Sequence, residues 1–466
     1  MKTLLKYTII LGIFIGMYSC SDFVEGYDKS PNRPTEVTPA MLLSASQLGL
    51  QVSYTSGIIR TTSVLVQQIA GTKDQMLDAA SYSIREGDNI NEWNTIYNNV
   101  VQPANDIIAA NEATNPYYTG MAKVLKAMGL GLATATWGDV PATEAGMGIV
   151  NGNKAPKFDT QQAVYTYIIT LLNEANVHLS KAPADNVSEP STDDFYYGGD
   201  VAKWKNLIVW LKARYENHLS KKDAAGSATK VLALLGTDIT GVKDLGNLEA
   251  KYGDGGSEMN QWYAFENSRA DYIKAGAKLV DMLKAKSDPR LAFYFSKKTN
   301  ADFLGSTPNE PLEPLSALSV VGPYIGGKTS SIPMVTYTEA LFIQAEAALR
   351  ANNKTLAANA YNAAVKASIK QVTGADADAA YITAEASETQ ATITLEKIMT
   401  QKYIAMFINI EAWTDYRRTG FPTLSANING DVTGIPQRFP TVIDERKYNP
   451  KAIVVSDILK KIWIAE

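Results

Sequence analysis

The side chains best placed for chemistry lie near the C-terminus, where charged residues gather around two aromatic ones. Asp415 lies three residues before Arg418 and four after Glu411, so the three share one face of a helix. Arg417 lies beside them, and two interpretations follow. Either the two arginines bind an anionic ligand, or the charges form an ion cluster that fixes a central helix in the core. We favour the ion cluster, since removing one partner of such a buried pair is strongly destabilising.

The residues before this cluster predict a buried helix. From Leu395 to Ile410, apolar side chains occur on almost every side of the helical pattern, which is typical of a helix in the core of a large protein. Gly420 and Pro422 then end the helix. We therefore expect one central helix that begins near Thr394 and continues into the charged cluster.

Few residues could support metal-dependent or nucleophilic catalysis. His178, His218 and Cys20 are the only histidines and the only cysteine, too few for a His/Cys metal cluster. A Cys–His or Ser–His catalytic pair would need one of those two histidines. Carboxylate pairs for glycoside hydrolysis could form among 48 acidic residues, but no local pattern singles one out. We expect a protein that is not an enzyme, with an exported glycoside hydrolase as the alternative.

A glycine-rich turn at 253–256, followed by Glu258, could bind calcium through carboxylates and carbonyls. It lacks the alternating oxygen ligands of a twelve-residue calcium loop. The more economical interpretation is a turn that presents Asn260, Trp262 and Tyr263. We therefore expect no cofactor, with a structural calcium ion as a minor alternative.

Aromatic residues in glycine- and asparagine-rich loops are the best indication of function. An exposed flat ring stacks on the apolar face of a sugar or on a peptide side chain, while Asn and Arg contact hydroxyls and carbonyls. The alternative is that each ring covers a loop against the scaffold; for Trp93 the two interpretations are balanced. The predicted ligand-binding residues are Trp93, Asn260, Trp262, Tyr263 and Tyr324.

The first residues predict export and a lipid anchor. Residues 1–19 have a positive start and a short apolar run, as in a signal peptide. Cys20 follows Ser19 and is best explained as the acylated first residue of a bacterial lipoprotein. Residues 20–39, with three interleaved prolines, predict an extended tether. The net charge of −4 gives no basic surface for nucleic acid.

The mature chain, residues 40–466, is expected to form a single, mostly α-helical domain. Ala345, Ala357, Tyr361 and Ala364 have the spacing of a tetratricopeptide-like helix hairpin, with small residues at the helix contact and an aromatic ring filling the gap. Long loops between the hairpins are expected to be binding loops. The expected helices cover residues 41–71, 88–111, 117–137, 160–180, 201–220, 337–351 and 355–371.

Several stretches, taken in order, resemble the SusD/RagB-like family of nutrient-binding outer-membrane lipoproteins of the Bacteroidetes type. The stretch from Glu411 to Pro422, EAWTDYRRTGFP, looks like the C-terminal signature of that family. The other matching stretches are Cys20, Trp137-Gly-Asp-Val-Pro141, Asp200-Val-Ala-Lys-Trp204, Asp288-Pro-Arg290, Tyr337–Ala347 and Pro436-Gln-Arg-Phe-Pro440.

This resemblance implies a mostly helical fold with four tetratricopeptide-like hairpins that support a loop-rich ligand face. It further implies a protein anchored by lipid in the outer membrane and facing the cell surface. Such a protein captures an oligosaccharide, or in some branches a peptide, and delivers it to a SusC-like TonB-dependent transporter. The resemblance does not fix the ligand-contacting residues, which are inferred from composition alone.

We predict that Cys20 is the mature N-terminus and carries lipid. Each buried CH₂ group contributes ~0.8 kcal/mol, and stable anchoring needs more than one acyl chain. Cys20→Ala should therefore move the protein from the membrane fraction to the soluble fraction. Labelled palmitate incorporation and membrane pelleting measure this; a variant that still pellets, with an unlabelled parent, would exclude the anchor.

Overall fold

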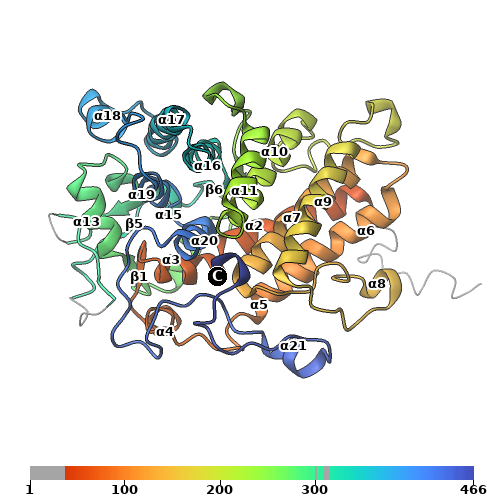
Figure 1. The fold of residues 1–466 in the computed structure, drawn as a ribbon. Helices are drawn as coiled ribbons and strands as arrows, with labels where there is room; N and C mark the ends of the chain where they lie inside the picture. The colour runs from red at the N-terminus through yellow and green to blue at the C-terminus, as the bar shows by residue number, and fades with distance from the viewer. Residues whose placement is uncertain (1–36, 300–301, 309–313) are drawn as a thin grey trace, which may run out of the picture.

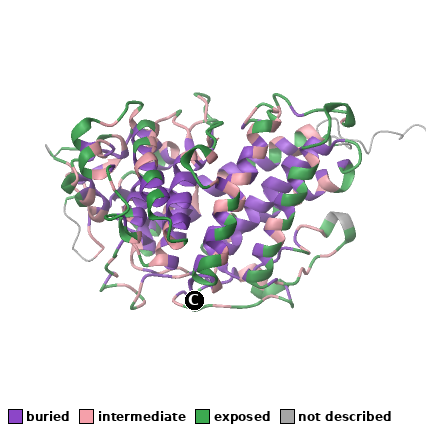
Figure 2. Cartoon of the chain, turned by 45° about the horizontal axis from the view of Figure 1, so that its top comes forward, coloured by how far each residue is buried: buried purple, intermediate pink, exposed green. Residues whose placement is uncertain are grey.

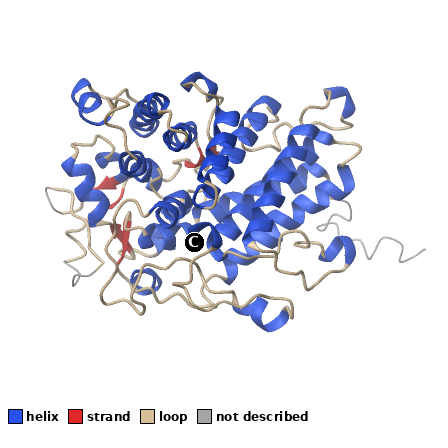
Figure 3. Ribbon diagram, in the orientation of Figure 1, coloured by secondary structure: helices blue, strands red, loops and turns tan. Residues whose placement is uncertain are grey.

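The computed structural model describes residues 37–299, 302–308 and 314–466, so the signal peptide, Cys20 and most of the tether lie outside the described residues. The described chain is mostly α-helical, and its sheets are small, as predicted (Figures 1 and 3). Three antiparallel pairs of short strands form the sheets: β1 (Ile69–Gly71) with β3 (Ile273–Ala275), β2 (Leu248–Ala250) with β6 (Ile332–Val335), and β4 (Phe295–Ser296) with β5 (Val320–Val321).

Long helices form the scaffold, and side-chain oxygens of Thr160, Asp200 and Thr336 cap the N-termini of three of them. Figure 1 shows α6, α7 and α9 side by side, with α10 and α11 between them and α16 to α18. The scaffold helices are α2 (Pro39–Thr55), α3 (Gly57–Leu65), α6 (Gln102–Asn111), α7 (Pro116–Trp137), α9 (Gln161–His178), α10 (Val201–His218), α11 (Ala224–Leu235), α16 (Tyr337–Arg350), α17 (Lys354–Thr373), α19 (Leu395–Ala405) and α20 (Ile410–Thr419).

Shorter helices lie in the long connections. They are α4 (Asp74–Ala80), α5 (Ile90–Asn94), the π-helical turn η1 (Thr95–Val101), α8 (Gly148–Asn151), α12 (Gln261–Ser268), α13 (Ala277–Ala285), α14 (Leu291–Tyr294), α15 (Pro323–Gly326), α18 (Ala379–Glu385) and α21 (Ile443–Tyr448). Single 3-10 turns are η2 (Pro183–Asp185), η3 (Leu219–Lys221), η4 (Ile239–Gly241) and η5 (Trp463–Ala465).

The predicted hairpin spacing is confirmed in α16 and α17. Ala345, Ala357, Tyr361 and Ala364 are each at most 2% exposed, at the contact between the two helices. Small residues have the same function elsewhere: a Cβ on Gly131 of α7 would lie 2.2 Å from the hydroxyl oxygen of a tyrosine on α10. Every residue of α7 is buried, and Figure 2 shows buried residues running through the whole helical interior.

The single helix predicted from Thr394 onward is wrong. The chain forms α19 and α20 with a break between them, where Ile408 has a φ of +58°. Gln68 stabilises the break: its amide group donates to the carbonyls of Tyr403 and Met406, and its side-chain oxygen accepts from the Ile408 N–H. This fully buried glutamine replaces the hydrogen bonds that a continuous helix would make.

The predicted helix over 41–71 is also interrupted. Ser56, with φ −110° and ψ −134°, separates α2 from α3. The last residues of the predicted helix form β1 instead, because Ile69, Ala70 and Gly71 pair with β3. Such pairing partners lie far away in sequence, so a local helical pattern does not reveal them.

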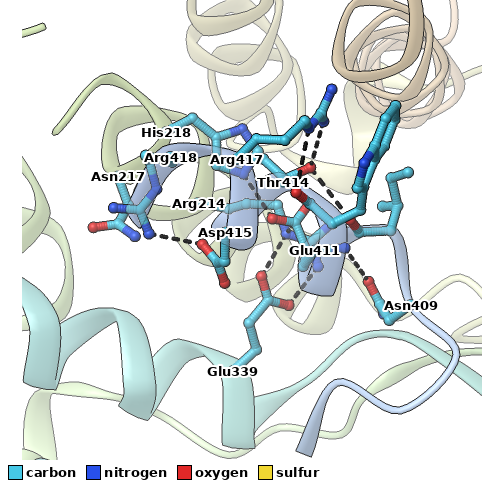
Figure 4. Close-up of polar contacts among 12 residues, drawn as sticks. Arg214, Asn217, His218, Glu339, Asn409, Glu411, Thr414, Asp415, Arg417 and Arg418 are labelled. Carbon is cyan, nitrogen blue, oxygen red and sulfur yellow. Dashed lines mark hydrogen bonds and ion pairs between the residues drawn. The ribbon is translucent and has the colours of Figure 1, made fainter. Parts of the chain in front are cut away.

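The charges at the end of α20 form a buried ion cluster, which confirms the favoured interpretation (Figure 4). Arg418 donates to Asp415 at 2.7 Å and to Glu346 of α16 at 2.8 Å. Lys402 of α19 completes the group, with its Nζ 2.8 Å from Asp415 Oδ2. Burial alone would raise the pKa of Glu346, but Arg418 and Arg350 hold that pKa well below its usual range.

A second group of charges adjoins the first. Arg214 of α10 pairs with Glu339 of α16, and His218 Nε2 lies 2.7 Å from Glu411 Oε2 of α20 (Figure 4). Arg417 makes no ion pair among the described residues; its guanidinium stacks on the Trp413 ring at 3.5 Å and donates to the Gln437 carbonyl. Buried ion pairs thus connect helices α10, α16, α19 and α20.

Arg418→Ala should destabilise the fold strongly. The change leaves Glu346 without its main partner in a position that is 1% exposed, and losing one member of a buried pair costs roughly 3–5 kcal/mol. Urea denaturation measures the free energy of unfolding. The control is Arg446→Ala, whose pair with Glu86 is exposed and should contribute far less to stability. Equal losses in the two variants would contradict the buried cluster.

Candidate ligand-binding site

Three hollows lie in the loop-rich part of the molecule and share walls. The polar cavity, about 310 Å³, lies between α3, α4 and the segment 83–92. The aromatic cavity, about 170 Å³, is built on α12 and closed by β3, β5 and α15. The tyrosine groove, about 390 Å³, lies beside α15 and β6. These volumes suit single sugar units or short ligand segments.

Helix α12 supplies the aromatic cavity with most of its wall. Asn260 caps the helix: its side-chain oxygen accepts from the N–H groups of Trp262 and Tyr263, at 2.7 and 3.2 Å. With the first turn fixed in this way, Trp262, Tyr263 and Phe265 line the cavity. Tyr263 is half-buried and can offer its ring, whereas Trp262 is 3% exposed and forms a largely covered wall.

Glu266 is the charged side chain that lines the aromatic cavity. It follows Phe265 on α12 and makes no ion pair among the described residues. Burial raises the pKa of Glu266, although two nearby lysines act in the opposite direction. With Asn267, which also lines it, the cavity combines flat rings with polar side chains, the combination that contacts both the faces and the hydroxyls of a sugar.

Tyr324 lies on the other side of α15, in the tyrosine groove. The side-chain amide of Gln371 donates to its hydroxyl at 2.8 Å, and the Tyr294 ring packs 5.7 Å away. Residues of α15 border both hollows, since Gly326 lines the aromatic cavity and Tyr324 lines the groove. The structure thus brings three predicted residues, Trp262, Tyr263 and Tyr324, to two adjoining hollows.

Sequence reasoning missed Arg60, which links the polar and aromatic cavities. Its guanidinium lines the polar cavity and lies 4.3 Å from the centre of the Phe265 ring, which lines the aromatic cavity. Burial lowers the pKa of Arg60 to about 10. The available signal was the single charged residue of α3, in the polar stretch 60–63 between Ile59 and Val64.

Two predicted ligand contacts require correction. Trp93 is 4% exposed and lies among Tyr97, Trp137 and Phe158, with the Trp137 ring 5.0 Å away, edge to face. Trp93 therefore packs a loop against the scaffold, which is the alternative interpretation given in the sequence analysis. Asn260 is fully buried, and its amide group donates to the Ser330 carbonyl while its oxygen caps α12, so it has no group left for a ligand.

The glycine-rich turn at 253–256 shows no metal geometry. Asp254 pairs with Lys328, and no group of three or more acidic, histidine or cysteine side chains in the described residues is placed to hold a metal ion. His178 lies 3.6 Å from Glu112, and His218 belongs to the buried charges described above. Among the helices of the described chain, none has the length and apolar character to cross a membrane.

Several solved structures share this fold. The chain is similar to a SusD/RagB family protein of Bacteroides thetaiotaomicron (24% identity, 92% of this chain and 99% of that one, TM-score 0.75). It is also similar to a chitin-binding SusD homologue of Flavobacterium johnsoniae (21% identity, 92% and 98%, TM-score 0.77) and a SusD homologue of Bacteroides fragilis (24% identity, 92% and 100%, TM-score 0.73). The search of curated proteins gave no match.

A family model covers most of the sequence. It matches residues 31–440 and has the description "starch-binding associating with outer membrane". The match includes the scaffold helices, the three hollows and the C-terminal ion cluster. The chain therefore belongs to the SusD-like family.

Proposed function

We propose that the protein is a cell-surface outer-membrane lipoprotein that captures an oligosaccharide and passes it to a SusC-like TonB-dependent transporter. The observation that supports this most directly is the shared wall of the polar and aromatic cavities, formed by Arg60 and Phe265. One side of the wall offers hydrogen-bonding groups and the other offers rings. A sugar chain presents both hydroxyl edges and apolar faces, so it can use the two sides together.

The geometry supports binding rather than catalysis. The Asn260 cap fixes Tyr263, and the hydrogen bond from Gln371 fixes Tyr324. Both residues are therefore positioned before a ligand arrives. Preorganised contacts reduce the entropy that binding costs. The starch-binding description of the family and the chitin-binding neighbour are both consistent with a glycan ligand.

A lipid anchor and a transporter partner complete the proposal. Cys20 would attach the protein to the membrane, and the tether up to residue 39 would hold the domain away from the membrane surface. Family membership and the family's association with the outer membrane support this placement. Because the ligand is handed on, modest affinity suits the function better than tight binding.

Tyr263→Ala should weaken glycan binding about tenfold and leave the fold intact. A ring contact contributes ~0.5–1.5 kcal/mol beyond burial, and tenfold in affinity corresponds to ~1.4 kcal/mol. Calorimetry with a neutral hexasaccharide that the parent binds measures this, and Tyr263→Phe should retain most of the affinity. Tyr448→Ala is the control, since Tyr448 is 76% exposed on α21. Equal affinities in all four proteins would place the ligand elsewhere.

The protein should co-purify with an outer-membrane TonB-dependent transporter. Permanent complexes typically bury more than ~2,000 Å² in total, which survives gentle detergent extraction. An affinity tag at the C-terminus and mass spectrometry of the eluate identify the partner. Recovery of only the free protein, from cells that also contain the transporter, would contradict the association.

A further inference from the structure

Arg60 is unusual because its guanidinium donates no hydrogen bond to any residue that the structure describes. It also makes no ion pair within that part of the chain. A guanidinium has five N–H donors, and half-buried groups of this kind are normally satisfied. Arg60 is nevertheless half-buried and lines the polar cavity. Its donors are therefore available to a molecule in the cavity.

Glu92 is the matching acceptor on the same cavity. It lies on α5, is half-buried and makes no ion pair among the described residues. Burial raises the pKa of Glu92, and the nearby charge of Arg60 acts in the opposite direction. The two opposite charges thus influence each other, yet their atoms do not approach to the 4 Å of an ion pair.

Two features of the fold hold this pair apart. The Phe265 ring holds the guanidinium of Arg60 at 4.3 Å, and Arg269 lies over the same ring at 5.3 Å. Gly57, the first residue of α3, leaves room for the carboxylate: a Cβ there would lie 1.9 Å from Glu92 Oε1. The separation is therefore built into the surrounding structure.

We propose that Arg60 and Glu92 bind one sugar unit between them, and that the carboxylates of this lining make the polar cavity reject anionic glycans. The inference rests on the proposed function and names the substrate class of the site. A hydroxyl group can accept from Arg60 and donate to Glu92 at once, and an acetamido group has one acceptor and one donor for the same purpose.

Anionic sugars fit this cavity poorly. A uronate carboxylate that reaches Arg60 also approaches Glu92, and Asp78 and Asp88 line the same cavity. A protonated amine is repelled by Arg60 but attracted by those three carboxylates. Because like charges in a partly desolvated site repel, the anionic unit is the one that this lining disfavours.

The test uses β-1,4-linked hexamers that differ in charge. They are hexamers of glucose, N-acetylglucosamine, glucuronate and glucosamine, with maltohexaose as a neutral α-linked hexamer, titrated by calorimetry at pH 6, where the glucosamine amine is protonated. We expect a neutral hexamer to bind at least tenfold tighter than the glucuronate hexamer. Glu92→Gln should improve glucuronate binding about tenfold relative to the neutral hexamer, and Arg60→Gln should do the same for glucosamine.

Gly57→Ala tests the same pair without a change of charge. The added Cβ displaces the Glu92 carboxylate, so neutral binding should weaken about tenfold while the melting temperature is retained. Gly256→Ala is the matched control, because a Cβ there meets nothing within 4 Å. This variant also keeps the test valid if Arg60→Gln or Glu92→Gln folds poorly.

Tightest binding of the glucuronate hexamer by the parent would overturn the inference. Unchanged affinity ratios in Arg60→Gln and Glu92→Gln, or an unchanged affinity in Gly57→Ala, would do the same while the proposed function stands, because the glycan would then bind elsewhere. If no hexamer binds to the parent, the proposed function itself is rejected, and this inference falls with it.

Discussion

The buried ion cluster around Arg418 is the constraint on which the scaffold depends. Asp415 and Glu346 are 3% and 1% exposed, so each carboxylate must find its positive partner inside the protein. The partners Lys402 and Arg418 come from α19 and α20, whereas Glu346 lies on α16, earlier in the sequence. Buried charge pairs are weak evidence for stability, but they tolerate few geometries. The cluster therefore fixes how these helices cross, and with them the base that carries the loops.

The sequence predicts the helices of the scaffold better than it predicts the breaks between them. The hairpin of α16 and α17 follows from a local pattern of alanines and one tyrosine, and the structure matches it. The break between α19 and α20 depends on Gln68, more than three hundred residues away. An apolar helical pattern carries no information about such a partner, so a continuous helix was the reasonable prediction.

The candidate site shows the same limit, because a local sequence pattern does not reveal tertiary neighbours. Tyr263 and Tyr324 were identified by aromatic rings in glycine-rich loops, and they do line hollows. Trp93 has a similar local sequence but packs against Phe158 and Trp137. The side-chain oxygen of Asn260 caps α12. Composition identifies the loops, whereas burial of each ring depends on tertiary neighbours. Arg60 was missed because it lies on a helix and not in a loop.

Arg418 and Arg60 show how one chain uses the same side chain in two ways. Arg418 donates to Ser220, Glu346 and Asp415, so both terminal nitrogens of its guanidinium are bonded within the scaffold. Arg60 has an acidic neighbour in Glu92, but a stacked ring and a glycine keep the two from joining. Arg60 makes no ion pair among the described residues, so its donors remain available to a group that comes between it and Glu92. This is why Arg60 supports the proposed ligand more directly than an aromatic ring, which packs equally well against the scaffold.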